Sequence, residues 1–267
     1  MKILRHLILC CALIAPYTSI AQSPVISIIT SVYNGDEFIE GFMRDITQQT
    51  IFNQCELIMI NANSSGNEEA VIKHYMAIYP NITYRKLNKD PGIYSVWNMA
   101  IDMAQGEFLT NANLDDRLRF DCYENHLKTL QENPDIDLVY SDFYFTRYPN
   151  ETFASTRYSF VHTFAEFSKK NMEECLPNNH PMWRKSFHQK YGLFDGTYKH
   201  VGDYEMWLRA VAQGTRFKKV QGVYGLYYYN PKGLSSNSSN PLLDKEDSAL
   251  RKKYSYLFTE YTENTKN

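Results

Sequence analysis

Hydrophobic residues in the first half of the chain alternate between short continuous runs and helical spacing. Val25–Val32 and Glu56–Ile60 are apolar runs, rich in β-branched residues, with the length of buried strands. The segment after the first run places Phe38, Phe42 and Ile46 at helical spacing. This pattern predicts a strand, a helix and a second strand in that order.

The same alternation continues toward the middle of the chain. The further predicted elements are a helix over Glu68–Ile78, a strand over Ile82–Leu87, a helix over Ile93–Ala104, and strands over Glu107–Thr110 and Asp137–Tyr140. Strands that alternate with helices predict an α/β fold with a mainly parallel central sheet flanked by helices. Such sheets bind ligands at the carboxyl ends of their strands. Because the polar turns at Asn61 and Asn113 both follow strands, we expect them at one edge of the sheet.

The first 21 residues form a separate segment. Lys2 and Arg5 precede the apolar stretch Leu7–Ala15, and the small residues Ser19–Ala21 follow it. A basic start, a short apolar run and a small-residue end predict a signal peptide. The run is shorter than the roughly 20 residues of a membrane span. We therefore expect export to a periplasm or secretory lumen, or membrane association through an uncleaved anchor.

Composition excludes some classes of partner. The chain has 267 residues, enough for one domain with a sizeable core, and a formal net charge of −2. This charge predicts no nucleic-acid partner. After the N-terminal segment, Cys55, Cys122 and Cys175 are too widely spaced for a disulfide framework or a zinc pattern. The high tyrosine content suits sugar stacking, although buried tyrosines of an ordinary core would give the same composition.

The densest polar cluster is Asn111–Arg117, directly after a predicted strand. Asp115 and Asp116 are adjacent carboxylates, which are costly beyond a buried strand unless a cation or a hydrogen-bond donor meets them. Oxygen ligands suit a divalent cation, and such a cation can bridge a diphosphate. An acidic turn that caps the following helix would explain the same residues.

Four segments, in order, resemble the nucleotide-binding half of glycosyltransferase family 2, which has the GT-A fold: Thr30–Asn34, the turn at Asn61, Asp90–Asn98, and the DXD-type motif Asn113–Asp116. The resemblance implies a nucleotide-sugar-binding half over residues 22–120 and an acceptor-binding half over residues 121–267 of the same domain. It implies that Asp115 and Asp116 hold Mn²⁺ or Mg²⁺. It assigns to the nucleotide pocket Asn34, Asn61, Asn63, Asp90, Asn98 and Asn113.

Two positions depart from the family pattern. Asn61 and Asn113 stand where relatives usually have aspartate. An asparagine side-chain oxygen can still accept a hydrogen bond from a base, or bind a hard cation, but it lacks the charge. The motif therefore keeps two carboxylates.

The second half also resembles the family, over Leu176–Arg184, Tyr191–Asp195 and His200–Arg209. The resemblance places the catalytic base at Asp203, which would take the proton from the acceptor hydroxyl. Asp203 as an N-cap of the following helix is the alternative. Glu205 is a rival base. Because residues two apart on a helix do not share a face, only one of the two should point into the site.

Three further side chains have two interpretations each. His180 and Arg184 could bind phosphate, and His180 could also bind metal, or both could be structural. Lys232 lies in the segment Tyr227–Ser235, which resembles the loop that closes over the diphosphate in relatives. It could neutralise phosphate or be solvated.

The resemblance implies an enzyme: an inverting glycosyltransferase that moves a sugar from a UDP- or GDP-linked donor to a carbohydrate, lipid or protein acceptor. A non-catalytic nucleotide- or carbohydrate-binding module, descended from such enzymes, is the alternative that Asn61 and Asn113 suggest. A sugar-1-phosphate nucleotidyltransferase usually has a glycine-rich loop after its first strand, where Tyr33–Asp36 has one glycine. A glycoside hydrolase would need a separated pair of carboxylates and no metal.

Overall fold

A computed structural model describes residues 23–234 and 240–259. Its helices and strands, in chain order, are β1 (Ile26–Val32), α1 (Ile39–Thr47), β2 (Cys55–Asn61), α2 (Glu68–Met76), β3 (Ile82–Lys86), α3 (Ile93–Met103), β4 (Phe108–Asn111), β5 (Arg117–Leu118), α4 (Cys122–Glu132), β6 (Leu138–Thr146), β7 (Phe160–His162), β8 (Met182–Arg184), α5 (Ser186–Tyr191), α6 (Gly202–Ala212), β9 (Phe217–Tyr228) and α7 (Pro241–Lys253). Across these two ranges, no helix is both long and apolar enough to cross a membrane. The predicted signal peptide or anchor over residues 1–21 lies outside them, so export and anchoring stay predictions.

The strands form one sheet in the order β3-β2-β1-β4-β8-β6-β9-β5, with β7 beside β6. β1 pairs in parallel with β2 and β4, and β2 pairs in parallel with β3. The carboxyl ends of these four strands therefore meet at one edge, as predicted. β8 pairs antiparallel with β4 and β6, whereas β6 and β9 are parallel. The predicted α/β fold with a central sheet is confirmed, and its second half adds antiparallel pairs.

Two hydrophobic clusters lie on the two faces of this sheet. Ile28 of β1 belongs to one cluster and Ile29 to the other, as the alternation of side chains along a strand requires. The cluster around Ile28 contains side chains of α1, α2 and α4. The cluster around Ile29 contains side chains of α3, α5, α6 and α7. Helices therefore cover both faces of the sheet, so a ligand would have to bind at the carboxyl edge of its parallel strands.

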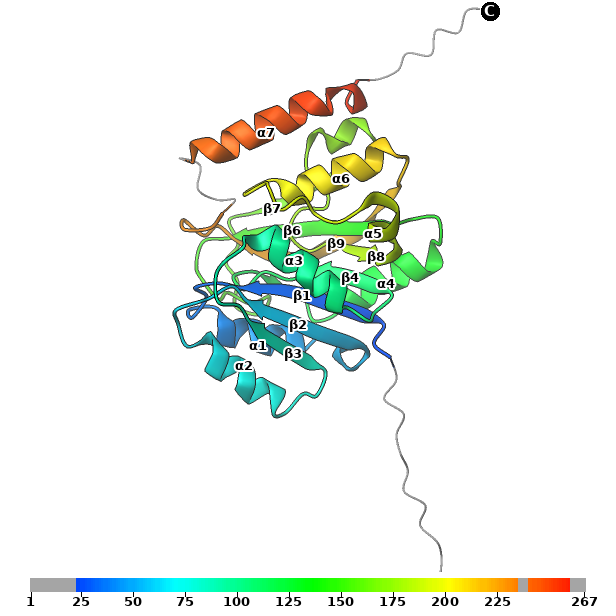
Figure 1. Ribbon diagram of the computed structural model, residues 1–267. Coiled ribbons are helices and arrows are strands. Elements are labelled where there is room, and N and C mark those ends of the chain that lie inside the picture. The colour runs from blue at the N-terminus through cyan, green and yellow to red at the C-terminus, as the bar shows by residue number, and fades with distance from the viewer. Residues whose placement is uncertain (1–22, 235–239, 260–267) are drawn as a thin grey trace, which may run out of the picture.

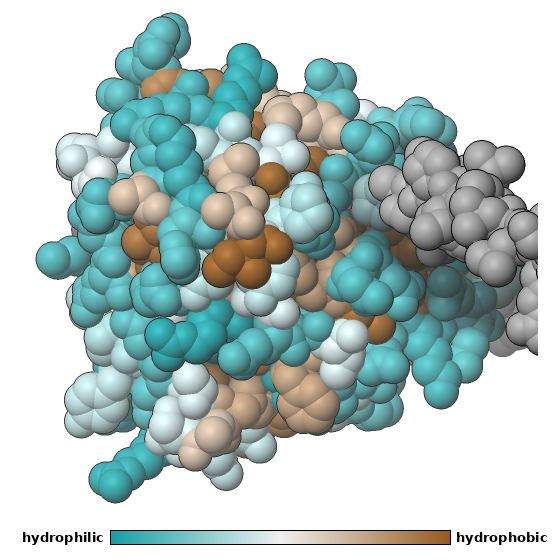
Figure 2. Space-filling view, turned by 90° about the horizontal axis from the view of Figure 1, so that it is seen from below, coloured by the Kyte–Doolittle hydropathy of each residue, from teal (hydrophilic) through white to brown (hydrophobic). Residues whose placement is uncertain are grey.

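The outermost layer on the α6 side is α7. Figure 1 shows α7 lying along α6, with the sheet beyond them. The opposite end of the molecule carries β3, an edge strand with mainly exposed residues, including Arg85 and Lys86. Charged side chains on an edge strand disfavour pairing with another chain. The face seen from this end is mainly hydrophilic, with small separate hydrophobic areas (Figure 2).

The pattern of the sequence did not predict β9, α4 or α7. β9 carries Lys218, Lys219 and Gln221, which interrupt an apolar run. Lys219 is nevertheless buried. Its charge is tolerated there because its Nζ lies 2.8 Å from Asp142 Oδ1 of β6. β9 forms by pairing with β6, which lies far from it in the sequence. A local pattern of residues does not reveal such a partner.

Candidate active site

Asp115 and Asp116 follow β4 at the carboxyl edge of the sheet. Asp116 is 7% exposed and accepts three hydrogen bonds. Asn113 Nδ2 and Asn179 Nδ2 donate to its Oδ2 at 3.1 and 3.3 Å, and the Tyr228 backbone N donates to its Oδ1 at 3.2 Å. These donors come from three segments of the chain, so the tertiary fold fixes the orientation of the carboxylate.

Asp115 is the more exposed member of the acidic pair. Its Oδ2 accepts a hydrogen bond from Asn230 Nδ2 at 2.9 Å. Asn230 follows β9 and lies in the segment that resembles the loop over the diphosphate. The contact brings this loop against the acidic pair.

The electrostatics of the pair suit a cation. Burial, together with the negative charge of Asp115, raises the pKa of Asp116 to about 7. A carboxylate whose ionisation is opposed in this way is stabilised when a positive charge lies beside it. The oxygens of the pair, with the side-chain oxygen of Asn113, are the ligand type that Mg²⁺ and Mn²⁺ prefer. The residues present therefore fit a divalent cation.

A cavity of about 330 Å³ opens beside this edge. Asn111 and Asn113 lie on its wall at the end of β4, and Asp203 lies on its wall at the start of α6. Its aromatic lining comes from α3, β6, α6, β9 and the residues after β9, and consists of Trp97, Phe143, Phe145, Tyr204, Tyr227 and Tyr229. A cavity walled by aromatic rings with a few polar groups is typical of a small-molecule site.

Asp203 is held by two donors. Its Oδ1 accepts from Tyr94 Oη at 3.1 Å and from the Tyr204 backbone N at 2.8 Å. The second bond satisfies an N–H group in the first turn of α6. The interpretation of Asp203 as the N-cap is wrong, because α6 begins at Gly202 and its N-cap is Val201. Burial raises the pKa of Asp203, and the two hydrogen bonds oppose that shift. A carboxylate with a raised pKa is a better proton acceptor near neutral pH.

Glu205 points away from the cavity lining. It is 3% exposed, and Arg209 Nη2 lies 3.0 Å from its Oε2. Tyr254 Oη donates to its Oε1 at 3.2 Å. The expectation that Asp203 and Glu205 do not share a face agrees with these contacts, since Asp203 lines the cavity. The role of Asp203 as the base stays a prediction.

The turns after β1 and β2 lie side by side. Asn34 and Asn63 both have positive φ, 47° and 67°, a conformation that asparagine tolerates better than most residues. Asn61 Oδ1 accepts from Ser64 N at 2.7 Å, and the Asn34 backbone N donates to Ser64 Oγ at 2.6 Å. The structure therefore brings three of the predicted nucleotide-pocket residues together. In this conformation the side-chain oxygen of Asn61 holds the turn.

Of the other three pocket residues, Asn113 bonds to Asp116, and Asp90 and Asn98 have local roles in the fold. Asp90 is exposed, and its Oδ1 accepts from Gly92 N at 2.7 Å. Asn98 Nδ2 donates to Phe194 O at 2.8 Å, and its Oδ1 accepts from Phe194 N at 3.0 Å. Both polar atoms of Asn98 are thus bonded to the backbone of the segment before α6. Nucleotide binding by these two residues stays a prediction.

Arg184 is placed away from the acidic pair. It pairs in register with Phe108, at the amino end of β4, whereas the acidic pair follows the carboxyl end. Its guanidinium donates to the carbonyl oxygens of Ile136 and Leu130. The interpretation of Arg184 as a phosphate ligand is therefore wrong; it binds the end of α4. Lys232 is exposed, as a solvated lysine would be.

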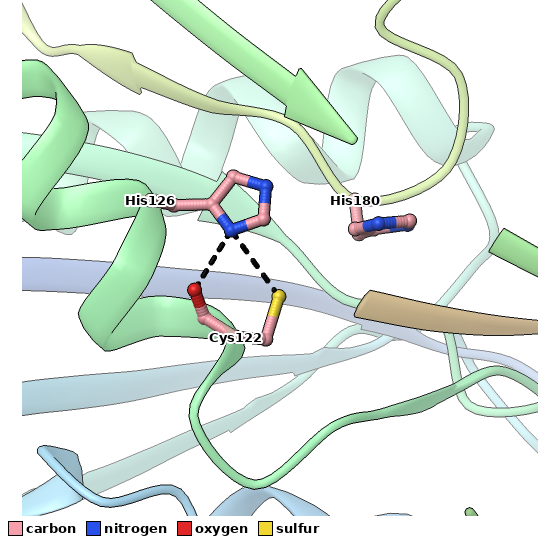
Figure 3. A group of neighbouring side chains, drawn as sticks. All are labelled: Cys122, His126 and His180. Carbon is pink, nitrogen blue, oxygen red and sulfur yellow. Dashed lines mark hydrogen bonds between the residues drawn. The ribbon is translucent and has the colours of Figure 1, made fainter. Parts of the chain in front are cut away.

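His180 belongs to a buried group with Cys122 and His126, whose possible ligand atoms lie within 4.8 Å of one another (Figure 3). His126 Nδ1 lies 2.7 Å from Cys122 O and 3.4 Å from Cys122 Sγ. Both ring nitrogens of His180 have partners, Asn179 Oδ1 and Ser141 Oγ. A metal ion would have to replace these bonds, so the geometry describes a hydrogen-bonded core cluster.

Three residues with contacts at the site were not predicted from the sequence: Tyr94, Asn179 and Glu68. Tyr94 lies within the segment Asp90–Asn98, and its contact with Asp203 spans 109 positions. Asn179 precedes His180 in a stretch without periodicity. Glu68 is fully buried, and its Oε1 accepts from Gly35 N at 2.6 Å. The sequence showed only a glutamate at the start of a predicted helix; its burial and its bond to Gly35 appear only in the structure.

Comparisons with known proteins show the family of this chain. The family model described as glycosyl transferase family 2 matches residues 27–192. The uncharacterized glycosyltransferase MJ1057 from Methanocaldococcus jannaschii is 25% identical over 204 residues, which cover 75% of this chain and 69% of that protein.

Solved structures share the fold. S. aureus TarS 1–349 in complex with UDP-GlcNAc has a TM-score of 0.69 at 15% identity, over 87% of this chain and 66% of that one. The chain spans 37% of a longer TarS structure. The mannosyltransferase PcManGT from Pyrobaculum calidifontis, in complex with GDP-Man and Mn²⁺, has a TM-score of 0.62 at 14% identity, over 88% of this chain and 72% of that one. Since the family model matches more than half of the chain, this protein belongs to glycosyltransferase family 2 and is a glycosyltransferase of the GT-A fold.

Proposed function

We propose that the protein transfers a sugar from a nucleotide-sugar donor to a carbohydrate or lipid acceptor by a single, inverting displacement. The observation that carries the proposal is the position of the two acidic groups. Asp115 and Asp116 follow the end of β4, and Asn113, which bonds to Asp116, lies on the wall of the cavity that Asp203 also lines. The acidic pair is thus suited to bind a cation at the diphosphate, and Asp203 is suited to accept a proton from the acceptor.

The donor class is inferred from the fold. TarS binds UDP-GlcNAc and PcManGT binds GDP-Man with Mn²⁺, and both share the fold of this chain. The turns at Asn34, Asn61 and Asn63 supply the edge at which the nucleotide would bind. A divalent cation held by Asp115 and Asp116 would offset the negative charge of the diphosphate as it leaves.

The chemistry assigned to this chain's own residues is proton transfer and orientation. Asp203 takes the proton of the acceptor hydroxyl, and the acceptor oxygen forms a bond to the anomeric carbon. The bond between that carbon and the diphosphate oxygen breaks, and the nucleoside diphosphate leaves with the bonding electrons. Attack from the face opposite the leaving group inverts the anomeric centre.

Two substitutions test the assignment. In a panel of UDP- and GDP-sugars with added Mn²⁺, Asp115→Ala and Asp203→Asn should each lower donor hydrolysis or transfer at least about 100-fold, the lower range of a lost general base. EDTA should abolish the activity of the unaltered protein. Asp102→Asn, an exposed aspartate on α3, is the control and should keep full activity.

The same experiments distinguish an enzyme from a non-catalytic binding module. Full activity in both variants would contradict the assignment of these residues. Donor binding by calorimetry, without turnover by the unaltered protein across donors and acceptors, would favour a non-catalytic module.

A further inference from the structure

A chain of hydrogen bonds runs from the acidic pair into the protein core. Asn179 Nδ2 donates to Asp116 Oδ2 at 3.3 Å, and Asn179 Oδ1 lies 2.8 Å from His180 Nδ1. At the far end, His180 Nε2 lies 2.9 Å from Ser141 Oγ of β6. All four residues are at most 7% exposed. The chain is therefore shielded from competing water.

The ionised carboxylate of Asp116 only accepts, so the Asn179 NH₂ group faces it and the Asn179 oxygen faces His180, whereas the Ser141 hydroxyl can donate or accept. An amide oxygen accepts and never donates, so His180 Nδ1 carries the proton toward Asn179 Oδ1. Burial lowers the pKa of His180 to about 3, so its ring is neutral near pH 7. Its Nε2 then has a lone pair and accepts from the Ser141 hydroxyl. The tautomer of His180 thus fixes which end of the Asn179 amide faces Asp116.

The ring of His180 is also held sterically. A Cβ atom at Gly225 would lie 2.5 Å from His180 Cε1, so β9 passes directly against the ring. The ring of His126 packs against the ring of His180 at a centroid distance of 5.9 Å. Because the ring of His180 cannot rotate, its Nδ1–H group stays directed at Asn179 Oδ1 and prevents the Asn179 amide from flipping.

We propose that His180 is a positioning residue for the acidic pair: by holding Asn179, it keeps the carboxylate of Asp116 in the orientation that binds the divalent cation. This inference rests on the proposed function, because it gives the cation to Asp115 and Asp116. His180 does not touch the substrate or the cation. It acts through the Asn179 amide, which has no other way to present its NH₂ group to Asp116 while its oxygen is bound.

Two substitutions of similar size separate positioning from simple core packing. In His180→Asn, the new Nδ2 can take the place of Nδ1 and still donate to Asn179. In His180→Gln, the longer amide reaches toward the place of Nε2 and Ser141, and the donor to Asn179 is lost. Both remove an aromatic ring, so a purely structural role would affect both alike.

The measurement is Mn²⁺ affinity in the presence of UDP, from electron paramagnetic resonance of the free ion, together with the melting temperature. His180→Gln should weaken Mn²⁺ binding about tenfold, the lower range for loss of a group that orients a metal ligand. His180→Asn should stay within about twofold of the unaltered protein. Equal affinities of the two variants would overturn the proposal.

A second variant covers the case in which His180→Gln fails to fold. Asn179→Ala leaves His180 in the core and breaks the same link, so it should weaken Mn²⁺ binding to a similar extent. Unchanged Mn²⁺ affinity in Asn179→Ala would refute the link. Failure of the proposed function has a different signature: the unaltered protein would then bind no Mn²⁺ with UDP.

Discussion

Asp203 and Tyr94 form the contact on which proton transfer depends in the proposed mechanism. Tyr94 is 4% exposed, and burial raises its pKa well above the ordinary value, so its hydroxyl stays protonated and donates to Asp203 Oδ1. This bond favours the ionised carboxylate and opposes the effect of burial. The balance of the two sets the pH below which the base is lost.

Tyr94→Phe should move the acid limb of the pH profile of kcat/KM to higher pH. Without the hydroxyl, the pKa of Asp203 rises further, and activity falls sooner as pH decreases. The expected shift is roughly one pH unit, because one pKa unit corresponds to about 1.4 kcal/mol, the order of one hydrogen bond to a charged group. Tyr123→Phe is the matched control. The buried Tyr123 hydroxyl has no hydrogen-bond partner in the described structure, and its removal should leave the limb in place.

At the scale of elements, β6 and β9 are joined through a buried ion pair at an irregularity in their register. The register shifts on both sides of Asp142. Lys219 Nζ lies 2.8 Å from Asp142 Oδ1 and donates to Phe164 O at 2.7 Å. Phe164 N in turn donates to Asp142 Oδ1 at 2.9 Å. The pair fixes β6, β9 and the segment after β7 relative to one another.

Lys219→Met should lower the free energy of unfolding by about 3 kcal/mol or more, because it leaves the Asp142 carboxylate buried without its cation. Urea denaturation measures the change. The double variant Asp142→Asn with Lys219→Met removes both charges and should be less destabilised than Lys219→Met alone. A double variant as unstable as the single one would show that packing, and not the unpaired charge, causes the loss.

At the scale of the whole molecule, one sheet carries both the turns after β1 and β2 and the cavity beside β4, and α7 forms part of the cavity wall. Leu243, Asp247 and Arg251 of α7 line the cavity. Leu250, 1% exposed, anchors the helix in the cluster that includes α6. If the acceptor binds in this cavity, as proposed, its binding depends on the position of α7.

Leu250→Ala should cost about 2–4 kcal/mol of stability, as expected for truncating a buried leucine. Because α7 loosens, the KM for acceptor should rise, whereas the affinity for UDP in calorimetry should stay unchanged. Leu242→Ala, on the same helix but 40% exposed, is the control and should change neither. A loss of UDP affinity in Leu250→Ala would contradict the separation of the two sides.

Local sequence patterns predicted the alternation of strands and helices as far as β4. β1 and β2 are apolar runs whose burial follows from their composition, and β3 is a shorter edge strand with mainly exposed residues. The sequence also placed Asn61 and Asn113 at one edge, because parallel strands bring their carboxyl ends together. The resemblance to glycosyltransferase family 2, which rested on four motifs in a fixed order, is confirmed.

The contact partners of the site residues depend on the packing of the whole fold. Tyr94 meets Asp203, and Asn179 meets Asp116, across long stretches of chain. The carbonyl groups that bind Arg184 are likewise distant in sequence. Such contacts depend on how sheet and helices pack, and a local pattern of hydrophobic and polar positions does not encode the pairing of one side chain with another far along the chain.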